Sequence, residues 1–215
     1  MIKFLLKESF KGTTLLRAFQ NKEFQNIKLE GKVIDLGARD GESSYYESFD
    51  IQEAEFTYVD KYSSSPSVVN LDLENILPLN DKEYDRVLSI NLFEHIYNVN
   101  QLINEIYRIL KINGILIGST PFSKEYHPDP GDYYRFTQDF YNKIFSDAGF
   151  NDIKIVPVGI GIFHVMANDL TRIVRIKILK YLIWILCINL DKLLNKVYKN
   201  NKNFYCALVF YCQKS

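Results

Sequence analysis

The ten residues from Lys32 to Gly41, KVIDLGARDG, constrain the fold of this chain more than any other segment. A short apolar run containing Asp35 is followed by Gly37 and Gly41, a pattern typical of a strand that turns into a helix. Glycine has no Cβ and tolerates left-handed dihedral angles, so its backbone can approach a ligand closely. The first amides of the following helix would then face that ligand. The segment therefore predicts a nucleotide-type binding loop in an α/β fold.

A second strand-like run, Phe56–Val59, ends in Asp60, nineteen residues beyond Gly41. A carboxylate at this place binds ribose hydroxyls in dinucleotide-binding folds. The dinucleotide fingerprint requires G-x-G-x-x-G, whereas this loop carries Arg39 and Glu42 where the second and third glycines would stand. A nicotinamide-dependent oxidoreductase is therefore disfavoured.

The loop instead resembles the first motif, D-x-G-x-G-x-G, of class I S-adenosylmethionine (SAM)-dependent methyltransferases, with Arg39 in place of the middle glycine. Further segments resemble later motifs of the small-molecule, type 11-like branch of that family, in the expected order. These segments are Tyr58–Asp60, Leu71–Leu73, Tyr84–Ser89, Asn91–Ile96 and Glu105–Pro121. The resemblance covers residues 30–160 and a terminal strand near residues 203–211.

The resemblance implies a Rossmann-like, seven-stranded, mostly parallel sheet with helices on both faces, an antiparallel last strand and a helical insertion before it. It also implies SAM as the cofactor. Carried over position by position, it assigns cofactor contacts to Asp35, Gly37, Ala38, Gly41, Asp60, Lys61, Asp72, Leu73 and Asn91. Two alternatives remain open for Arg39. Its side chain crowds the methionine part of SAM, or it points outward and only its amide faces the ligand.

Strand-like and helix-like segments alternate along the chain, which predicts a mostly parallel sheet covered on both faces. We expect strands at residues 32–36, 56–60, 67–70, 84–90, 113–119 and 151–158. We expect helices at 41–50, at 99–111 between an Asn98 cap and Asn113-Gly114, and at 137–148 after a Thr137 cap. The 215 residues suit one domain, 1–215. Its expected parts are a helical segment 1–28, a cofactor-binding core 29–160, a basic apolar helical insertion 169–199 and a terminal strand 203–213.

The loop after the fifth expected strand, Thr120–Arg135, is long and rich in proline, aromatic and charged residues, as functional loops often are. Methyl transfer from a sulfonium is an in-line displacement that requires alignment and, for an alcohol acceptor, a base. The candidate bases are His127 and His95, with Asp129 and Asp132 as second choices. The alternatives are that His95 only lines the cofactor pocket and that His127 is an ordinary loop residue. No metal is required, and the three histidines lack metal-ligand spacing.

The same loop has a narrower resemblance to a segment of bacterial methyltransferases linked with surface-glycan synthesis. Its Tyr133, Tyr134 and Arg135 are expected to contact a sugar or a carboxylate, unless this turn simply packs back on the domain. An N-P-P-[YFW] motif, typical of enzymes that methylate adenine or glutamine amides, is absent after the fourth expected strand. Nucleic acid is therefore not expected as a partner.

Residues 170–199 carry seven basic side chains against Asp191 alone, although the whole chain has no net charge. The longest uncharged run there, Tyr181–Leu190, has ten residues, far below the ~20 needed to span a bilayer. Trp184 among leucines and isoleucines, flanked by lysines and arginines, suits an anionic membrane surface. A homo-oligomer interface and a helix packed on the protein's own core are the alternatives.

The cysteines, Cys187, Cys206 and Cys212, have no C-x-x-C spacing and are expected to be reduced thiols of a cytoplasmic protein. If residues 170–199 contact a membrane, the protein lies peripherally at the inner membrane face and its acceptor is lipid-linked.

The main hypothesis is a SAM-dependent methyltransferase that acts on a small molecule or glycan-type acceptor, at oxygen. The alternative is a non-catalytic SAM-fold binding or scaffold protein in which Arg39 impairs cofactor binding.

Overall fold

The computed structural model describes residues 1–41 and 43–215, which divide into two compact units. The first, which we call the sheet unit, comprises residues Phe24–Thr120, Tyr126–Val156 and Val209–Ser215. The second, the helical unit, comprises Met1–Glu23, Pro121–Glu125 and Pro157–Leu208.

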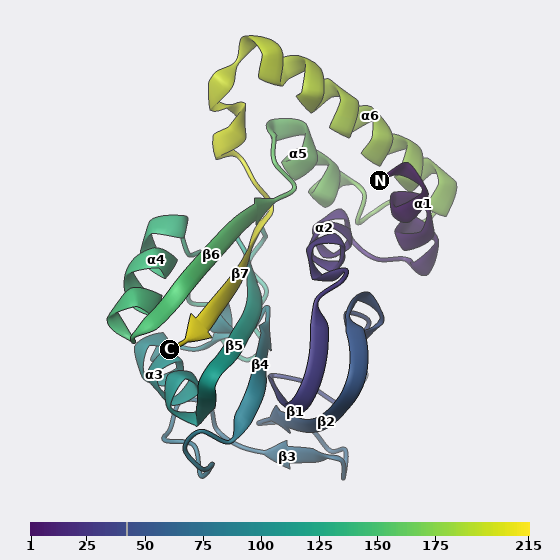
Figure 1. The fold of residues 1–215 in the computed structure, drawn as a ribbon. Coiled ribbons are helices and arrows are strands. Elements are labelled where there is room, and N and C mark those ends of the chain that lie inside the picture. Colours follow the sequence, from purple (N-terminus) through teal and green to yellow (C-terminus); the bar gives the residue numbers. More distant parts are fainter. Residues whose placement is uncertain (42) are drawn as a thin grey trace. The chain divides into compact units, whose positions relative to one another are not determined.

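Seven strands form one sheet in the order β3-β2-β1-β4-β5-β7-β6 (Figure 1). They are β1 (Lys28–Leu36), β2 (Asp50–Asp60), β3 (Val68–Asn70), β4 (Tyr84–Ile90), β5 (Leu110–Pro121), β6 (Phe150–Val158) and β7 (Ala207–Lys214). The pairs β1–β2, β1–β4, β2–β3 and β4–β5 are parallel, and β7 runs antiparallel between β5 and β6. The predicted seven-stranded sheet and its antiparallel last strand are confirmed.

The two central strands, β1 and β4, are buried because both of their faces are covered. The last four residues of β1, VIDL, and the last four of β4, VLSI, are all buried. Such nearly continuous apolar runs are typical of parallel strands inside an α/β sheet. The strand order reverses between β1 and β4, and ligands of open α/β sheets bind outside the carboxyl ends of the strands at such a point.

Two helices of the sheet unit agree with the sequence pattern in position. Helix α3 (Val99–Ile109) buries the five apolar residues that recur at helical spacing, namely Val99, Leu102, Ile103, Ile106 and Ile109. Asn98 does not cap it, because its side-chain amide donates to Gln101 Oε1 at 2.8 Å instead of accepting from the backbone. Helix α3 also ends before Asn113, since β5 begins at Leu110. Helix α4 (Gln138–Asp147) begins as predicted, with the Thr137 side chain accepting from the amide of Phe140.

The helix predicted at residues 41–50 is wrong for the part of that stretch that the structure describes. It contains a short 3-10 turn, η1 (Tyr46–Ser48), and β2 already begins at Asp50. Aromatic contacts explain the difference, because Tyr45 is buried and the Phe49 ring stacks on Phe24 at 4.9 Å between centroids. These anchors hold the segment in turns. Glu42 lies outside the described residues.

The helical unit contains α1 (Ile2–Lys11), α2 (Leu15–Phe24, whose last residue belongs to the sheet unit), α5 (Ile162–Leu170), α6 (Lys177–Val197) and the 3-10 helix η3 (Lys199–Asn203). One face of α6 packs into a cluster made of Leu5, Leu15, Ala18, Ala167, Trp184, Cys187 and Ile188. Trp184 is fully buried, and its Nε1 donates to Thr171 Oγ1 at 2.9 Å. The helix predicted within residues 169–199 therefore packs, on this face, on the protein's own core.

Among the described residues, α6 and the other helices are too short or too polar to cross a bilayer. The three cysteines are buried free thiols, and burial raises the pKa of Cys206 to about 12.

Gly118 in β5 tests the packing of the sheet. A Cβ at this position would lie 2.2 Å from the buried Phe210 ring of β7 and 2.6 Å from the Ser89 carbonyl oxygen of β4. We expect Gly118→Ala to lower the free energy of unfolding by about 1–3 kcal/mol, measured by urea denaturation, because the core has no room for the methyl group.

The double variant Gly118→Ala/Phe210→Leu is the control, because a smaller residue at 210 removes the clash with the ring and leaves only the one with the Ser89 carbonyl oxygen. Its loss of stability should be smaller than the sum of the two single losses. Additive losses would contradict the packing described for Gly118.

Candidate functional site

Asp60, the last residue of β2, presents a half-buried carboxylate at the edge where cofactor contacts are predicted. Its Oδ2 accepts a hydrogen bond from the Arg39 amide at 3.0 Å, and its Oδ1 accepts one from the Tyr62 amide at 2.8 Å. An ionised carboxylate has about four acceptor positions. Two such bonds therefore leave capacity for the two hydroxyls of a ribose, and the geometry fits the predicted role of Asp60.

Of the two alternatives for Arg39, the structure shows the one in which the side chain points outward. Its φ of +52° is in the left-handed region, and its amide binds Asp60. Its guanidinium pairs with Asp129 at 2.6 Å, with 76% of the Arg39 side chain exposed. The side chain thus lies across the surface toward the loop after β5. Asp129, a second-choice base, is held in this exposed ion pair.

The glycine loop itself differs from the expected one. The amides of Gly37 and Ala38 donate to the Val59 carbonyl oxygen at 2.8 and 3.0 Å. Because the described residues between β1 and β2 include no α-helix, the expectation that the first amides of a helix face the ligand is wrong. Gly37, with φ +76°, is still required, since a Cβ there would lie 2.9 Å from the Leu92 side chain. Gly41 likewise has a positive φ, of +77°, beside the Tyr58 ring.

Asp35 lies inside the protein, where two tyrosines contact its carboxylate. It is fully buried, and its Oδ2 accepts hydrogen bonds from the hydroxyls of Tyr45 at 2.6 Å and Tyr46 at 2.5 Å. Burial, and next the negative charge of Asp35, raises the pKa of both tyrosines far above the ordinary value. Asp35 therefore holds Tyr45 and Tyr46 of the segment between β1 and β2 in place by hydrogen bonds. The sequence pattern does not indicate this role.

The remaining predicted cofactor residues follow the neighbouring strand ends. Lys61 Nζ donates to Asp72 Oδ2 at 2.7 Å, and this hydrogen bond is the main cause of the lowered pKa of Asp72. Leu73 beside it is buried. After β4, Asn91 has a φ of +54°, and its Oδ1 accepts from Ser119 Oγ at 3.1 Å.

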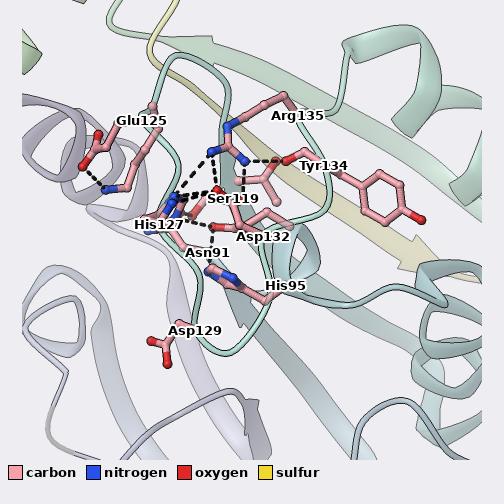
Figure 2. A network of polar contacts seen from close by, with 12 residues as sticks. Asn91, His95, Ser119, Glu125, His127, Asp129, Asp132, Tyr134 and Arg135 are labelled. Carbon is pink, nitrogen blue, oxygen red and sulfur yellow. Dashed lines mark hydrogen bonds and ion pairs between the residues drawn. The ribbon is translucent and has the colours of Figure 1, made fainter.

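The two histidines named as candidate bases come together around Glu94. His95 and Glu94 belong to the 3-10 turn η2 (Phe93–His95) that follows β4, and His127 lies in the loop after β5. Glu94 Oε1 is 3.7 Å from His95 Nε2 and 3.9 Å from His127 Nε2. The two rings lie 5.1 Å apart, and Glu94 is fully buried. Asp129 stands apart from both histidines (Figure 2).

Outer contacts orient both imidazoles. His95 Nδ1 is 2.5 Å from the Gly131 carbonyl oxygen, which can only accept, so this nitrogen carries the proton. His127 Nδ1 lies 3.3 Å from Asp132 Oδ2 (Figure 2). Arg135 binds both oxygens of Asp132, at 2.5 and 2.8 Å, and holds the pKa of that carboxyl far below its ordinary value. Both Nε2 atoms are thereby directed toward Glu94.

The three predicted substrate-binding residues do not share one environment. Tyr134 donates its hydroxyl to the Tyr97 carbonyl oxygen at 2.9 Å, and Arg135 holds Asp132, so both side chains fold back on the loop. Tyr133 is half exposed, and its ring lies 5.4 Å from that of the exposed Tyr97. Sequence reasoning missed Tyr97, although it closely follows the Glu94-His95 motif.

Comparisons with known proteins agree with this geometry. Residues 30–118 match the family model described as a methyltransferase domain. These residues resemble a methyltransferase domain, in agreement with the class I SAM-dependent family that the sequence motifs indicate. A search of the curated proteins finds no significant match to the chain.

Solved structures show the same fold. A SAM-dependent methyltransferase from Archaeoglobus fulgidus is 20% identical with a TM-score of 0.58, and 99% of each chain is covered. The [4+2]-cyclase SpnF is 15% identical with a TM-score of 0.57, covering 90% of this chain and 79% of its own. Phosphoethanolamine N-methyltransferase 2 from Haemonchus contortus, solved with SAM, is 16% identical with a TM-score of 0.56, covering 91% of this chain and 52% of its own. Because the identities are only 15–20%, these comparisons show a common fold and nothing about the substrate.

The tyrosines around Asp35 provide a test of the loop. We expect Tyr46→Phe to lower the free energy of unfolding by about 1.5–3 kcal/mol in urea denaturation, because it removes a hydrogen bond to a buried charge. Tyr62→Phe, at an exposed position in the same unit, is the matched control and should change stability little. Equal effects of the two variants would show that Asp35 does not depend on Tyr46.

Proposed function

We propose that this chain is a SAM-dependent methyltransferase that transfers a methyl group to an oxygen of a small molecule or glycan-type acceptor. The observation that carries the proposal is the arrangement of His127, Asp132 and Arg135 beside the end of β4. An imidazole held by a carboxylate can take a proton there. Asp60, whose carboxylate keeps acceptor positions for a ribose, lies at the end of β2 in the same sheet.

The residues that would hold SAM follow the strand ends. Asp60 would bind the ribose hydroxyls, Asp72 and Leu73 would border the adenine, and Asn91 with the Gly37 turn would border the methionine part. When bound, SAM supplies a methyl group activated by its sulfonium. Arg39 does not oppose this arrangement, because its side chain is occupied by Asp129 at the surface.

The proposed role of His127 is to accept the proton of the acceptor hydroxyl at Nε2. The new O–CH₃ bond forms as the S–CH₃ bond breaks, and the proton remains on the imidazole until solvent takes it. Asp132 Oδ2 lies 3.3 Å from Nδ1 and Arg135 Nη2 lies 3.4 Å from it, so these two side chains would orient the ring. A positioned base of this kind contributes about 10²–10⁴-fold to rate.

The exposed aromatic pair Tyr97 and Tyr133 is the proposed contact for the acceptor. The two rings meet edge to face near the His95–His127 pair, since Tyr97 closely follows His95 and the Tyr133 amide donates to the Glu94 carbonyl oxygen. Such rings offer apolar faces to a sugar and hydroxyls to its polar edge. Glycan-type acceptors suit this surface.

Binding of SAM tests the proposal directly. We expect Asp60→Ala to weaken SAM binding by about 10–100-fold in isothermal titration calorimetry, because charge-assisted hydrogen bonds to the ribose are lost. Asp50→Ala, at the opposite end of the same strand, is the matched control and should leave the affinity unchanged. An unchanged affinity in Asp60→Ala would remove the proposed ribose contact.

A second function has one observation in its favour. The described residues between β1 and β2 form no α-helix whose first amides could face the methionine part of SAM. A non-catalytic scaffold with this fold would show neither binding heat nor a thermal shift with SAM or S-adenosylhomocysteine. Heat with either ligand supports the enzyme.

We also propose that the helical unit contacts an anionic membrane surface at the inner membrane face, where a lipid-linked acceptor would be found. The unit has 14 basic and 5 acidic side chains, a net charge of +9, and the rest of the chain therefore carries −9. The outer face of α6 exposes Leu179, Leu182, Leu186 and Leu193, which recur at helical spacing. Leucines beside lysines suit anionic lipid.

An apolar cavity of about 480 Å³ in the same unit strengthens the choice of a lipid over a second protein copy. It is lined by Met1, Ile2, Lys3, Leu5, Ile185, Ile188, Asn189 and Lys192. Its apolar lining suits an acyl or prenyl chain, and the two lysines suit a phosphate-bearing head group. This combination is less suited to a protein partner.

Vesicle co-sedimentation tests the membrane contact. We expect binding to vesicles with phosphatidylglycerol but not to pure phosphatidylcholine, and we expect Leu182→Ser/Leu186→Ser to reduce it at least fivefold. Val69→Ser/Ile76→Ser, at exposed apolar positions of the sheet unit, is the matched control. Absence of binding, or equal binding by both double variants, would overturn the proposal. A dimer lost only in the α6 variant would assign this face to a second copy.

A further inference from the structure

We propose that Glu94, His95 and His127 form a binding site for a divalent transition-metal ion. One carboxylate oxygen and two imidazole nitrogens, one from each residue, all lie within 4.8 Å of one another. The three residues come from two segments, the η2 turn after β4 and the loop after β5.

The distances match a site ready to close around an ion. Glu94 Oε1 lies 3.7 Å from His95 Nε2 and 3.9 Å from His127 Nε2, beyond the ~3.2 Å limit of a normal hydrogen bond. Zinc bonds to nitrogen and oxygen ligands measure about 2.0–2.2 Å, which places neighbouring ligand atoms roughly 3.0–3.5 Å apart. The two distances from Glu94 would have to shorten by a few tenths of an ångström, and the histidine nitrogens, which lie within 4.8 Å of each other, by up to about 1.5 Å.

Contacts behind the histidines have the form that metal sites use. A metal-bound imidazole usually donates its other nitrogen to a carbonyl oxygen or a carboxylate, which fixes the ring. His95 Nδ1 has the Gly131 carbonyl oxygen in this position, at 2.5 Å. His127 Nδ1 lies 3.3 Å from the Asp132 carboxylate, which Arg135 holds, and 3.4 Å from Arg135 Nη2. A simple ion pair between Glu94 and the histidines would not require contacts at the Nδ1 side of both imidazole rings.

The donor set indicates which ion would bind. Two imidazoles and one carboxylate favour Zn²⁺, Fe²⁺ or Mn²⁺ over Ca²⁺ and Mg²⁺, which prefer oxygen ligands. Three protein ligands leave coordination positions open, as in catalytic rather than structural sites. The side chains of His95 and His127 are 11% and 23% exposed, whereas Glu94 is fully buried, so solvent borders the cluster on the histidine side.

The inference rests on the proposed methyl transfer to oxygen, assigns the activation of the hydroxyl to the ion in place of His127, and names the acceptor class, a diol such as two adjacent sugar hydroxyls. Its two oxygens would occupy the open positions, and the ion lowers the pKa of the bound hydroxyl. The proton leaves to solvent, the O–CH₃ bond forms as the S–CH₃ bond breaks, and S-adenosylhomocysteine departs. With the ion bound, His127 Nε2 is a ligand and no longer the base.

The test uses the full chain, stripped with a chelator and titrated with Co²⁺, whose visible absorption reports nitrogen and oxygen ligands, and with Zn²⁺ by calorimetry. We expect one ion per chain, and at least tenfold weaker binding in Glu94→Gln and His127→Gln. Asp129→Asn, in the same loop but outside the cluster, is the matched control and should bind as the parent chain does. Circular dichroism verifies that each variant is folded.

Failure of this inference and failure of the proposed function give different results. No stoichiometric binding, or equal binding by the three variants, overturns the metal site. If SAM still binds and methyl transfer continues after chelation, His127 keeps its role as the base. Stoichiometric Co²⁺ binding that Glu94→Gln abolishes supports the site even in a chain that binds no SAM.

Discussion

The parallel pairing of β1 with β2 on one side and β4 on the other is the constraint on which the site depends. This register places Asp35 opposite Tyr58 of β2 and Leu88 of β4, and it brings the ends of these strands to one edge. Each of the three strands is followed there by a polar segment. The ribose carboxylate Asp60 and the Glu94 turn therefore lie at the same edge of the sheet because of backbone hydrogen bonding.

Two carboxylates, those of Asp35 and Asp132, determine the local backbone geometry of the site. Each has different hydrogen-bond partners. Asp35 is held by tyrosine hydroxyls, which fix the segment before β2 as turns. Asp132 is held by Arg135 and by the His127 amide, which returns the loop after β5 to the strand ends. A buried charge is tolerated only with such partners, so each carboxylate imposes one conformation on its segment.

Much of the fold was predictable because its signals are local. The apolar runs of the parallel strands, the five-residue buried face of α3 and the Thr137 cap each lie within a few neighbouring residues. The helix expected at 41–50 failed because its Gly-Ser-rich start has weak helix propensity and its tyrosines found a distant partner in Asp35. Asn98 failed as a cap because Gln101 competed for its side chain.

The sequence by itself determined the sheet, the cofactor edge and the list of candidate groups, since hydrophobic period, turn residues and motif order are properties of short segments. Tertiary structure alone decided which of these groups meet. His95 and His127 are 32 positions apart, and Arg39 and Asp129 are 90 apart, yet each pair is in contact or nearly so. Contacts of this kind depend on strand register and loop closure, which involve residues from the whole sheet unit at once.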